Sequence, residues 1–396
     1  MTEKTKQIQQ TKQTNDVGLE NIADFFKNTY HLKSNPFIVH PCQTIKEYLD
    51  RFQAVDKFVN DLNMLSISGI GANRVIIGDK GMGKTSLMNI CAVRAKERGL
   101  KTIYVERVPN RAKEFMEVLL KKTLDVLVGD NPGIRQTYGR IGGTTQTTED
   151  LYQMWVNAMG QIKARPVIVF FDETSALPDM HYVESYFNNY IFDHLKDIVF
   201  VMGCTTVTYH KIDARMGGFI DRFPQVVNLP HFSEEDSVEC LKKKILIERT
   251  MKKAGDALQP FTKEAVEHLV ELSDGVPRYL LEIAFNTLNV GASQGVKEIN
   301  ADIVDQAAFV AKKSMLHNIW NSLSISQRKV LTKIAEIGGE TKLANLSGSL
   351  ERAKSTVSPW LSHLVECGLV EQIGTSKREI SYKLTVDPVD VRKLSQ

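Results

Sequence analysis

The chain has 396 residues, of which 42% are hydrophobic and 24% charged, and a formal net charge of +3. No apolar run approaches the roughly 18–20 residues of a membrane span, and the Lys/Gln/Thr-rich N-terminus lacks an apolar signal core, so we expect a cytoplasmic protein without membrane contact. A charge of +3 does not by itself indicate a nucleic-acid binder. The five cysteines form no C-x-x-C pair, which argues against zinc and disulfides and predicts reduced thiols.

The first part of the chain is expected to hold a tail and two helices. Residues 1–18 carry almost no large apolar side chains and are expected to be disordered, although they are also suited to an interaction tail. Apolar spacing predicts helices over 19–30 and 44–65, joined by an extended connection at Pro36. The apolar residues 37–39 in this connection are candidates for contact with an adenine base or for ordinary packing.

Residues 78–85, Gly-Asp-Lys-Gly-Met-Gly-Lys-Thr, match the phosphate-loop pattern G-x-x-x-x-G-K-[ST] at every fixed position. A β-branched run at 74–77 precedes the match and a helical pattern opens at Ser86. Glycines allow successive N–H groups to face phosphate oxygens, and the helix N-terminus adds partial positive charge. We therefore predict a nucleotide site in which Lys84 reaches the β- and γ-phosphates and Thr85 binds Mg²⁺. Its nucleotide-contacting residues are expected to be Gly78, Asp79, Lys80, Gly81, Met82, Gly83, Lys84, Thr85 and Ser86.

Alternating strands and helices follow the loop. A strand is predicted at 102–105 and an amphipathic helix at 112–128. Residues 129–148, with Arg135 and Arg140, are read as a solvated loop or as a DNA-contacting element. This alternation predicts a parallel sheet with helices on both faces.

The apolar run 167–171 predicts a strand that delivers Asp172 and Glu173 at its C-terminal end, where open α/β sheets place their chemistry. Paired acids after a hydrophobic strand are typical of the second nucleotide-hydrolysis motif. Asp172 is expected to hold Mg²⁺, directly or through water. Glu173 is expected to orient and polarise the attacking water.

A further strand at 198–202 ends in two threonines, which a parallel neighbour of the Asp172 strand would direct toward the γ-phosphate. Thr206 is our first choice for this contact and Thr205 the second. A fifth strand is predicted at 226–229. Arg215 and Arg222 precede it, and either is placed to project into a neighbouring subunit's γ-phosphate, with Arg222 favoured.

This order of strands, acids, polar tip and arginines resembles the AAA+ ATPases over roughly residues 35–315. Helices after Ser233 and over 262–272 would form the helical lid of that family. Gly275-Val276-Pro277-Arg278 resembles its second sensor, with Pro277 in the first helical turn and Arg278 facing the nucleotide. The resemblance implies ATP and Mg²⁺ as cofactors, ATP hydrolysis and a homo-oligomer.

The C-terminal part resembles the winged-helix domains. After a long helix from about 300 to 317, helices are predicted at 324–337, 341–350 and 355–367, followed by strands at 369–373 and 379–384 around a basic tip. If the domain binds duplex DNA, one group of side chains meets phosphates and another faces base edges. The phosphate group is Arg352, Lys354, Lys377 and Arg378, and the base-facing group is Thr356, Ser358, Trp360 and His363. Protein docking is the alternative for this domain, and Trp360 is also suited to the core.

We therefore expect an α/β fold, an AAA+ parallel sheet with helical lid followed by a winged helix. The expected division is a tail at 1–18, a nucleotide-binding domain at 19–230, a lid at 231–320 and a winged helix at 321–396. This architecture resembles archaeal origin-recognition and helicase-loading initiators and implies a DNA-binding, ATP-dependent switch. Those initiators carry serine-asparagine at the first sensor, where this chain has Thr205-Thr206. Two alternatives therefore stay open: a mobile-element or transposition regulator, and a signalling or defence ATPase that docks protein.

Overall fold

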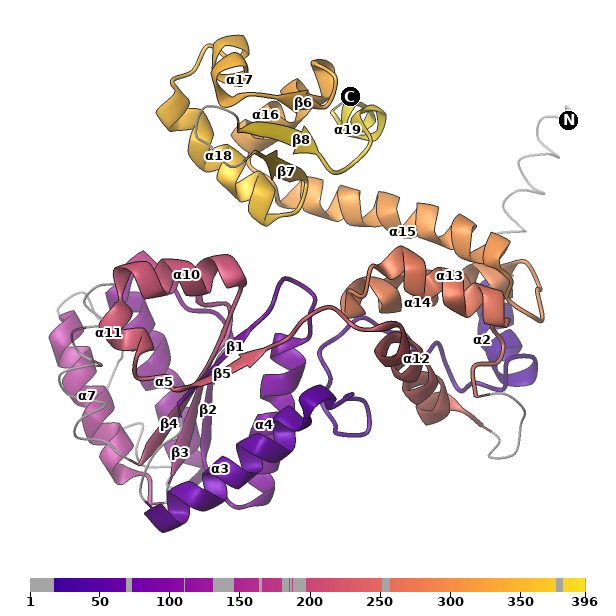
Figure 1. The fold of residues 1–396 in the computed structure, drawn as a ribbon. Coiled ribbons are helices and arrows are strands. Elements are labelled where there is room, and N and C mark those ends of the chain that lie inside the picture. Colours follow the sequence, from indigo (N-terminus) through magenta and orange to yellow (C-terminus); the bar gives the residue numbers. More distant parts are fainter. Residues whose placement is uncertain are drawn as a thin grey trace, which may run out of the picture. The chain divides into compact units, whose positions relative to one another are not determined.

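The computed structural model describes residues 18–68, 73–109, 111–130, 146–163, 166–179, 185, 187, 197–250, 257–374 and 380–395. The chain divides into two compact units, Met1–Val304 and Asp305–Gln396 (Figure 1). The predicted tail and most of the loop expected at 129–148 lie outside the described residues. The domain boundaries expected from the sequence stay predictions.

Five strands form a parallel sheet in the first unit, in the order β2-β3-β4-β1-β5. They are β1 (Arg74–Ile77), β2 (Thr102–Val105), β3 (Val167–Phe171), β4 (Ile198–Cys204) and β5 (Gln225–Asn228). Every residue of β1, β3 and β4 is buried, as their β-branched and aromatic runs require of strands covered on both faces. The predicted parallel sheet is confirmed, and β4 is the neighbour of the strand that ends before Asp172.

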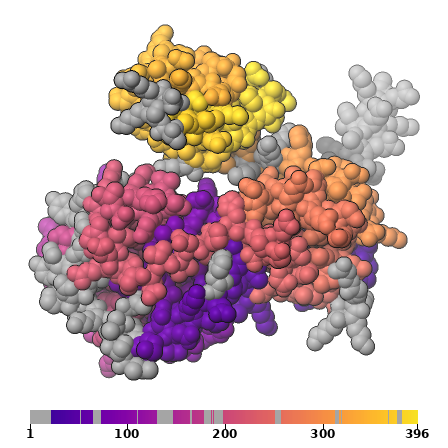
Figure 2. All heavy atoms as spheres, viewed as in Figure 1, coloured from indigo at the N-terminus to yellow at the C-terminus, as the bar shows by residue number. Residues whose placement is uncertain are grey.

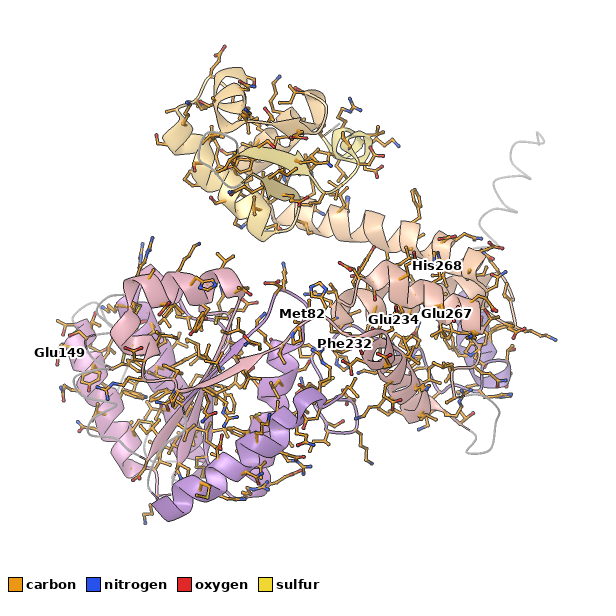
Figure 3. The ribbon with its side chains drawn as sticks, in the orientation of Figure 1. Met82, Glu149, Phe232, Glu234, Glu267 and His268 are labelled. Atoms are coloured by element: carbon orange, nitrogen blue, oxygen red, sulfur yellow. The ribbon has the colours of Figure 1, made fainter. Side chains whose placement is uncertain are left out.

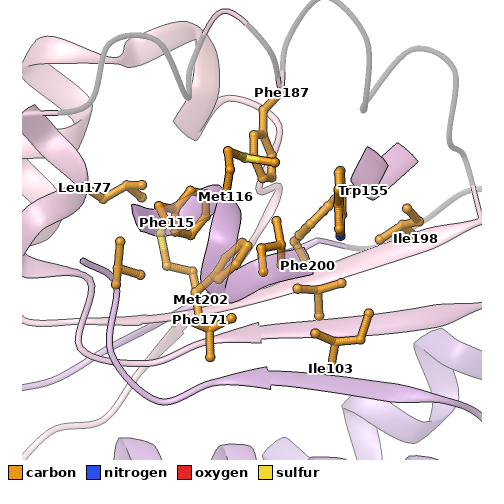
Figure 4. Packing of buried hydrophobic residues seen from close by; sticks show 14 of the residues in the cluster. Ile103, Phe115, Met116, Trp155, Phe171, Leu177, Phe187, Ile198, Phe200 and Met202 are labelled. Atoms are coloured by element: carbon orange, nitrogen blue, oxygen red, sulfur yellow. The ribbon is translucent and has the colours of Figure 1, made fainter. Parts of the chain in front are cut away.

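Alternate strand residues enter two different cores, because successive side chains point to opposite faces. Phe171 and Phe200, whose rings stack at 5.8 Å, pack with helices α5 (Ala112–Asp130), α7 (Thr148–Gln161), α10 (Thr206–Arg215) and α11 (Gly217–Ile220) (Figure 4). Phe170 and Val201 pack on the other face with α3 (Ala54–Ser68) and α4 (Lys84–Glu97). The sheet is thus the middle layer of three.

Two local predictions in this unit were wrong. The helix expected over 44–65 begins only at Ala54, after turns and the short η1 (Arg51–Gln53), because the Asp50 carboxylate accepts the Val55 N–H at 3.2 Å and ends the turn segment there. Helix α7 was not predicted. Its start is a capping box in which Thr147 and Asp150 exchange side-chain and backbone hydrogen bonds, a signal present in the sequence.

The lid consists of α12 (Glu234–Glu248), α13 (Lys263–Ser273) and α14 (Pro277–Ser293). Ser233 caps α12 and Pro277 opens α14, as predicted, and Thr262, expected as the first residue of a helix, is the N-cap of α13. Helix α2 (Gly18–Asn28) packs against α14. Just after α2, the Tyr30 hydroxyl donates to the Val296 carbonyl at 2.7 Å. The chain therefore contacts the lid before it enters the sheet.

The second unit is a winged helix. It contains α16 (Ile325–Glu336), α17 (Leu343–Ser349), α18 (Lys354–Glu366) and an antiparallel sheet of β6 (Glu340–Thr341), β8 (Ser381–Leu384) and β7 (Val370–Ile373). Leu316 and Trp320 of α15 (Ala301–Ser322) complete its core. The predicted hairpin is confirmed in the pairing of β7 with β8.

Three details of this unit differ from the prediction. The segment expected to be helical from 341 begins as strand β6, because Thr341 pairs with Tyr382 in the sheet. A last helix, α19 (Pro388–Leu394), was not predicted, although Asp387 caps it and Pro388 opens it. The basic tip of the hairpin at 375–379 lies outside the described residues. Among the helices that the structure describes, none is both long and apolar enough to cross a membrane.

Candidate nucleotide-binding site

The phosphate loop connects β1 to the first turn of α4. Gly81 and Gly83 have φ angles of 93° and 89°, in the left-handed region that favours glycine. Gly83 is the N-cap of α4 and provides no side-chain hydrogen bond. The backbone N–H groups of the first turn of α4 therefore have no capping side chain from this position. These are the requirements of an anion cradle at a helix N-terminus.

Lys84 bends back over this loop. Its Nζ donates to the Gly78 carbonyl at 2.7 Å and to the Asp79 carbonyl at 3.0 Å. Burial lowers the pKa of Lys84, an effect that the nearby Asp172 carboxylate opposes. The loop therefore holds a half-buried ammonium group beside its own backbone, where phosphate oxygens of a nucleotide would compensate its charge.

Thr85 and Asp172 meet at the carboxyl edge of the sheet. The Thr85 hydroxyl donates to Asp172 Oδ2 at 2.6 Å, and Asp172 is only 5% exposed. The Glu173 N–H donates to Asp172 Oδ1 at 3.0 Å. Hydroxyl and carboxylate oxygens are the ligands that Mg²⁺ prefers, and the structure brings together the two residues predicted to hold it.

Tyr104 also reaches this carboxylate and was missed by the sequence analysis. Its hydroxyl donates to Asp172 Oδ2 at 3.3 Å. Burial, and then the Asp172 carboxylate, raise the pKa of Tyr104, so the phenol stays protonated as a donor. Tyr104 pairs in register with Phe170, two residues before Asp172, and so lies on the same face of the sheet, but the sequence alone does not contain this register.

Glu173 lies exposed just beyond β3 with a φ angle of 44°. A left-handed conformation is uncommon for a residue other than glycine and, where it occurs, clusters at functional sites. Thr174 follows it and donates to the Gly203 carbonyl on the next strand at 2.9 Å, which fixes the backbone after Glu173. The predicted role of Glu173 in orienting the attacking water stays a prediction.

The two threonines after β4 divide their tasks. Thr205 caps α10, because its hydroxyl accepts the Thr208 N–H at 3.2 Å. The exposed Thr206 donates to Asp79 Oδ1 of the phosphate loop at 3.4 Å. Thr206, our first choice, therefore lies beside the candidate nucleotide site, while Thr205 is engaged in the helix cap.

Residues of the segment before the sheet pack against α4 and against the lid. The Ser86 hydroxyl accepts the Cys42 N–H at 3.0 Å and so joins the first turn of α4 to the segment before the sheet, while its contact with a nucleotide stays a prediction. Phe37 is fully buried and packs at 5.9 Å from the Phe261 ring, which answers the choice between base contact and packing in favour of packing. Ile38 and Val39 remain 50% and 38% exposed.

The lid touches the phosphate loop at the predicted second sensor. The Arg278 N–H donates to the Gly81 carbonyl at 3.3 Å, and a Cβ on Gly81 would lie 3.1 Å from Arg278 Cβ. The Arg278 side chain is exposed. The segment 230–232, which connects the sheet to the lid, also contacts the second sensor, since the Phe232 N–H donates to the Gly275 carbonyl at 2.7 Å. Figure 3 labels Met82 in the loop and Phe232 in this connection.

Arg51 braces the same connection. Its guanidinium donates to the carbonyls of Pro230 and His231 at 3.0 and 3.2 Å and lies 4.3 Å from the centre of the Phe232 ring. The Asp236 carboxylate of α12 is 3.6 Å away. Through Arg51, the segment before the sheet therefore contacts both the residues that follow β5 and the first lid helix.

The two candidate finger arginines lie at the surface of the first unit. Arg215 ends α10, and Arg222 follows α11 in the turn before β5. Both side chains are exposed, and α10 and α11 contribute to the face seen in Figure 2. The Arg222 carbonyl accepts from the Asn73 side chain at 3.0 Å, which fixes its backbone. Contact of either arginine with the γ-phosphate bound by a neighbouring subunit stays a prediction.

Helix α18 has a buried side and an outer side. Val357, Leu361 and Leu364 are fully buried in the winged-helix core. The outer residues of the helix are the exposed Lys354 and Thr356 and the half-buried Ser358, and the exposed Arg352 lies just before the helix.

Two base-facing candidates are engaged within the domain. Trp360 packs partly against the core, and His363 Nδ1 lies 3.5 Å from Sγ of Cys367, the residue that caps the end of α18. Lys377 and Arg378 lie outside the described residues.

Comparisons with known proteins agree with this architecture. No protein-family model matches the chain. An uncharacterized HTH-type transcriptional regulator of Methanocaldococcus jannaschii is 22% identical over 404 residues, which cover 94% of this chain and 96% of the relative.

Solved structures share the fold over nearly the whole chain. The ORC1 protein of Aeropyrum pernix in complex with DNA superposes with a TM-score of 0.66 at 13% identity, covering 91% of this chain and 94% of that chain. The ORC2 protein of the same organism, in ADPNP–ADP complexes, gives 0.52 at 16% identity, with 91% and 96% covered. Cdc6p from Pyrobaculum aerophilum gives 0.50 at 13% identity, with 91% and 97% covered. The predicted architecture is confirmed: the chain has an AAA+ α/β fold with a helical lid and a C-terminal winged helix, and it shares this fold with the ORC1 protein of A. pernix.

Proposed function

We propose that this protein is a DNA-binding AAA+ ATPase, an ATP-dependent switch of the initiator type. The observation that carries the proposal is the 2.6 Å contact between the Thr85 hydroxyl and the Asp172 carboxylate, with the Lys84 ammonium group beside the same loop. A hydroxyl, a buried carboxylate and an amine converge there from two motifs far apart in the sequence. The donors fit Mg²⁺ and the phosphates of ATP.

Each residue has a defined part in this proposal. The backbone of the phosphate loop and Lys84 bind and neutralise the phosphates, while Thr85 and Asp172 would hold Mg²⁺, which would supply further positive charge at the phosphates. Glu173 orients the attacking water and accepts its proton. Thr206 and Arg278, which approach the loop from β4 and from the lid, are suited to report the state of the γ-phosphate.

DNA binding by the winged helix is supported by three observations of different kinds. Arg352, Lys354 and Thr356 are exposed at and before the start of α18. The A. pernix ORC1 protein of the same fold is in complex with DNA. The relative from M. jannaschii is named an HTH-type transcriptional regulator. Two alternatives, a transposition regulator and a signalling ATPase with a protein-docking winged helix, share the nucleotide site and differ in the ligand of the second unit.

The nucleotide part is tested with two variants of the full chain. Lys84→Ala should weaken ATP binding and hydrolysis together, because it removes charge compensation at the phosphates. Glu173→Gln should keep ATP bound but stall the water attack. Binding is measured with a fluorescent ATP analogue and turnover by phosphate release. Parental turnover in Glu173→Gln would remove Glu173 from its assigned role, and a wild-type chain that binds no ATP would end the proposal.

A further inference from the structure

Tyr104 stands out among the residues around Asp172 because no nucleotide motif includes it. Its ring stacks on Phe170 with centroids 5.5 Å apart and planes inclined by 19°. It packs partly against the core formed with α3 and α4. A phenylalanine would make these apolar contacts equally well. The hydroxyl is therefore the part of the side chain that needs another explanation.

The Tyr104 hydroxyl donates to the buried Asp172 carboxylate at the carboxyl edge of the sheet. Asp172 Oδ2 accepts from two side-chain hydroxyls, Thr85 at 2.6 Å and Tyr104 at 3.3 Å, while Oδ1 accepts the Glu173 N–H at 3.0 Å. The carboxylate is thus held by donors from the phosphate-loop helix, from β2 and from its own chain. With both oxygens engaged, rotation of the carboxylate would break at least one of these hydrogen bonds.

Strand β4 lies close to the Asp172 carboxylate on the side away from β2. A Cβ added to Gly203 of β4 would lie 3.3 Å from Asp172 Oδ1 and 2.8 Å from Met88 Cε. The carboxylate is therefore confined between β4 and the Tyr104 hydroxyl from β2. This confinement and the three hydrogen bonds together favour the observed orientation of Asp172.

We propose that Tyr104 is a positioning residue that holds Asp172 in the orientation that binds Mg²⁺. This inference rests on the proposed nucleotide function. Partners that hydrogen-bond a metal ligand fix its orientation and tune its basicity, and their loss typically lowers metal affinity by about 10–100-fold. Tyr104 touches neither nucleotide nor water in this account and acts only through Asp172.

The test is Tyr104→Phe in the full chain, which keeps the stacked ring and removes only the hydroxyl. A fluorescent ATP analogue is bound in EDTA and then at increasing MgCl₂. We expect the Mg²⁺ concentration for half-maximal tightening to rise by about tenfold or more, with unchanged affinity in EDTA. Tyr104→Met, which keeps apolar packing through a flexible side chain, should show the same shift if it folds. Tyr48→Phe, at a half-buried tyrosine packed against the same core, is the matched control and should not shift the Mg²⁺ midpoint.

The outcomes separate this inference from the proposed function. A wild-type chain that binds the analogue neither with nor without Mg²⁺ would overturn both. Wild-type binding that depends on Mg²⁺, together with an unshifted Tyr104→Phe curve, would overturn the role of Tyr104 alone. An equal loss of affinity in EDTA and in Mg²⁺ would also overturn it, because a structural defect, and not a metal ligand's orientation, would then explain the loss.

Discussion

The carboxyl edge of the parallel sheet and the outer side of α18 are both candidate functional surfaces, but they are built differently. At the sheet edge, Thr85, Tyr104 and Asp172 come from three elements and meet within 3.3 Å at a buried carboxylate. At and just before the start of α18, Arg352, Lys354 and Thr356 are exposed side chains of one short stretch. The first surface depends on convergence of distant segments, whereas the second depends on charge at the outside of a packed helix.

This contrast explains why the first surface has a recognisable sequence motif and the second has none. Chemistry at phosphates needs a glycine-rich turn, a lysine and a carboxylate at fixed places on a sheet, and this requirement produces a recognisable pattern. Contacts with DNA phosphates need only positive charge at suitable points of a surface and leave no fixed pattern. Substitutions at the first surface should therefore abolish a function, while substitutions at the second should weaken binding in steps.

The largest expected effect concerns the arginine before β5. If Arg222 serves a neighbouring subunit, Arg222→Ala should lower turnover by about 10³–10⁵-fold, as for other trans-acting arginines. Mixing Arg222→Ala with Lys84→Ala protein should restore part of the turnover, because a mixed interface joins one intact site with one intact arginine. Phosphate release at several mixing ratios measures the effect.

Arg215 provides the control. If Arg222 is the acting residue, Arg215→Ala should keep parental turnover by itself. A loss of turnover in Arg215→Ala that mixing with Lys84→Ala restores, without such a loss in Arg222→Ala, would exchange their roles. Absence of rescue with both variants, in protein that forms oligomers, would contradict an arginine acting in trans.

The next effect concerns the buried side of α18. Leu361→Ala removes a fully buried side chain and should cost about 2–5 kcal/mol. Hydrogen exchange of the α16 and α18 amides measures this loss. The exposed neighbour Ser362, changed to alanine, should leave protection unchanged. Equal effects of the two variants would show that α18 does not have the two-sided packing described here.

A slightly smaller effect is expected where the lid joins the sheet. A Cβ on Gly275 would lie 2.5 Å from the Phe232 carbonyl oxygen, at a φ angle of 65°. Gly275→Ala should therefore cost about 2–4 kcal/mol from the clash and backbone strain together. Gly99→Ala is matched, because Gly99 has a φ angle of 75° but no atom within 4 Å of an added Cβ. Its cost should stay near 1 kcal/mol, from strain alone. Thermal unfolding of both variants decides whether the clash matters.

The smallest effect is expected at the exposed surface of the second unit. Replacing Arg352 and Lys354 by alanine should reduce the log–log salt slope of duplex binding by about 0.9 for each lost phosphate contact. The exposed Lys263 of α13, changed to alanine, is the control and should not alter the slope. Lys377 and Arg378 are predicted to act in the same way. Ser358→Ala or His363→Ala should instead change preference among sequences. An unchanged slope would remove Arg352 and Lys354 from the interface.

The sequence predicted those parts of the fold that leave a periodic or motif signal. The positions of the five strands along the chain, the placement of Thr85 and Asp172 at one site and the start of α14 at Pro277 all followed from such signals. Helices α7 and α19 were missed although their caps were readable, because the flanking segments suggested loops. Tyr104 was missed because its role depends on strand register, which one strand's sequence does not contain. The burial of Phe37 depends on a ring more than two hundred residues away in the lid.

The most direct test of the central claim is duplex binding by the full chain in different nucleotide states. Fluorescence anisotropy of a labelled duplex at low salt is measured with ATP and with ADP, for the wild-type chain and for Lys84→Ala. An ATP-dependent switch predicts salt-sensitive binding whose affinity differs between ATP and ADP in the wild-type chain, and the loss of that difference in Lys84→Ala. Absence of duplex binding at low salt in every nucleotide state would contradict the account and favour the signalling alternative.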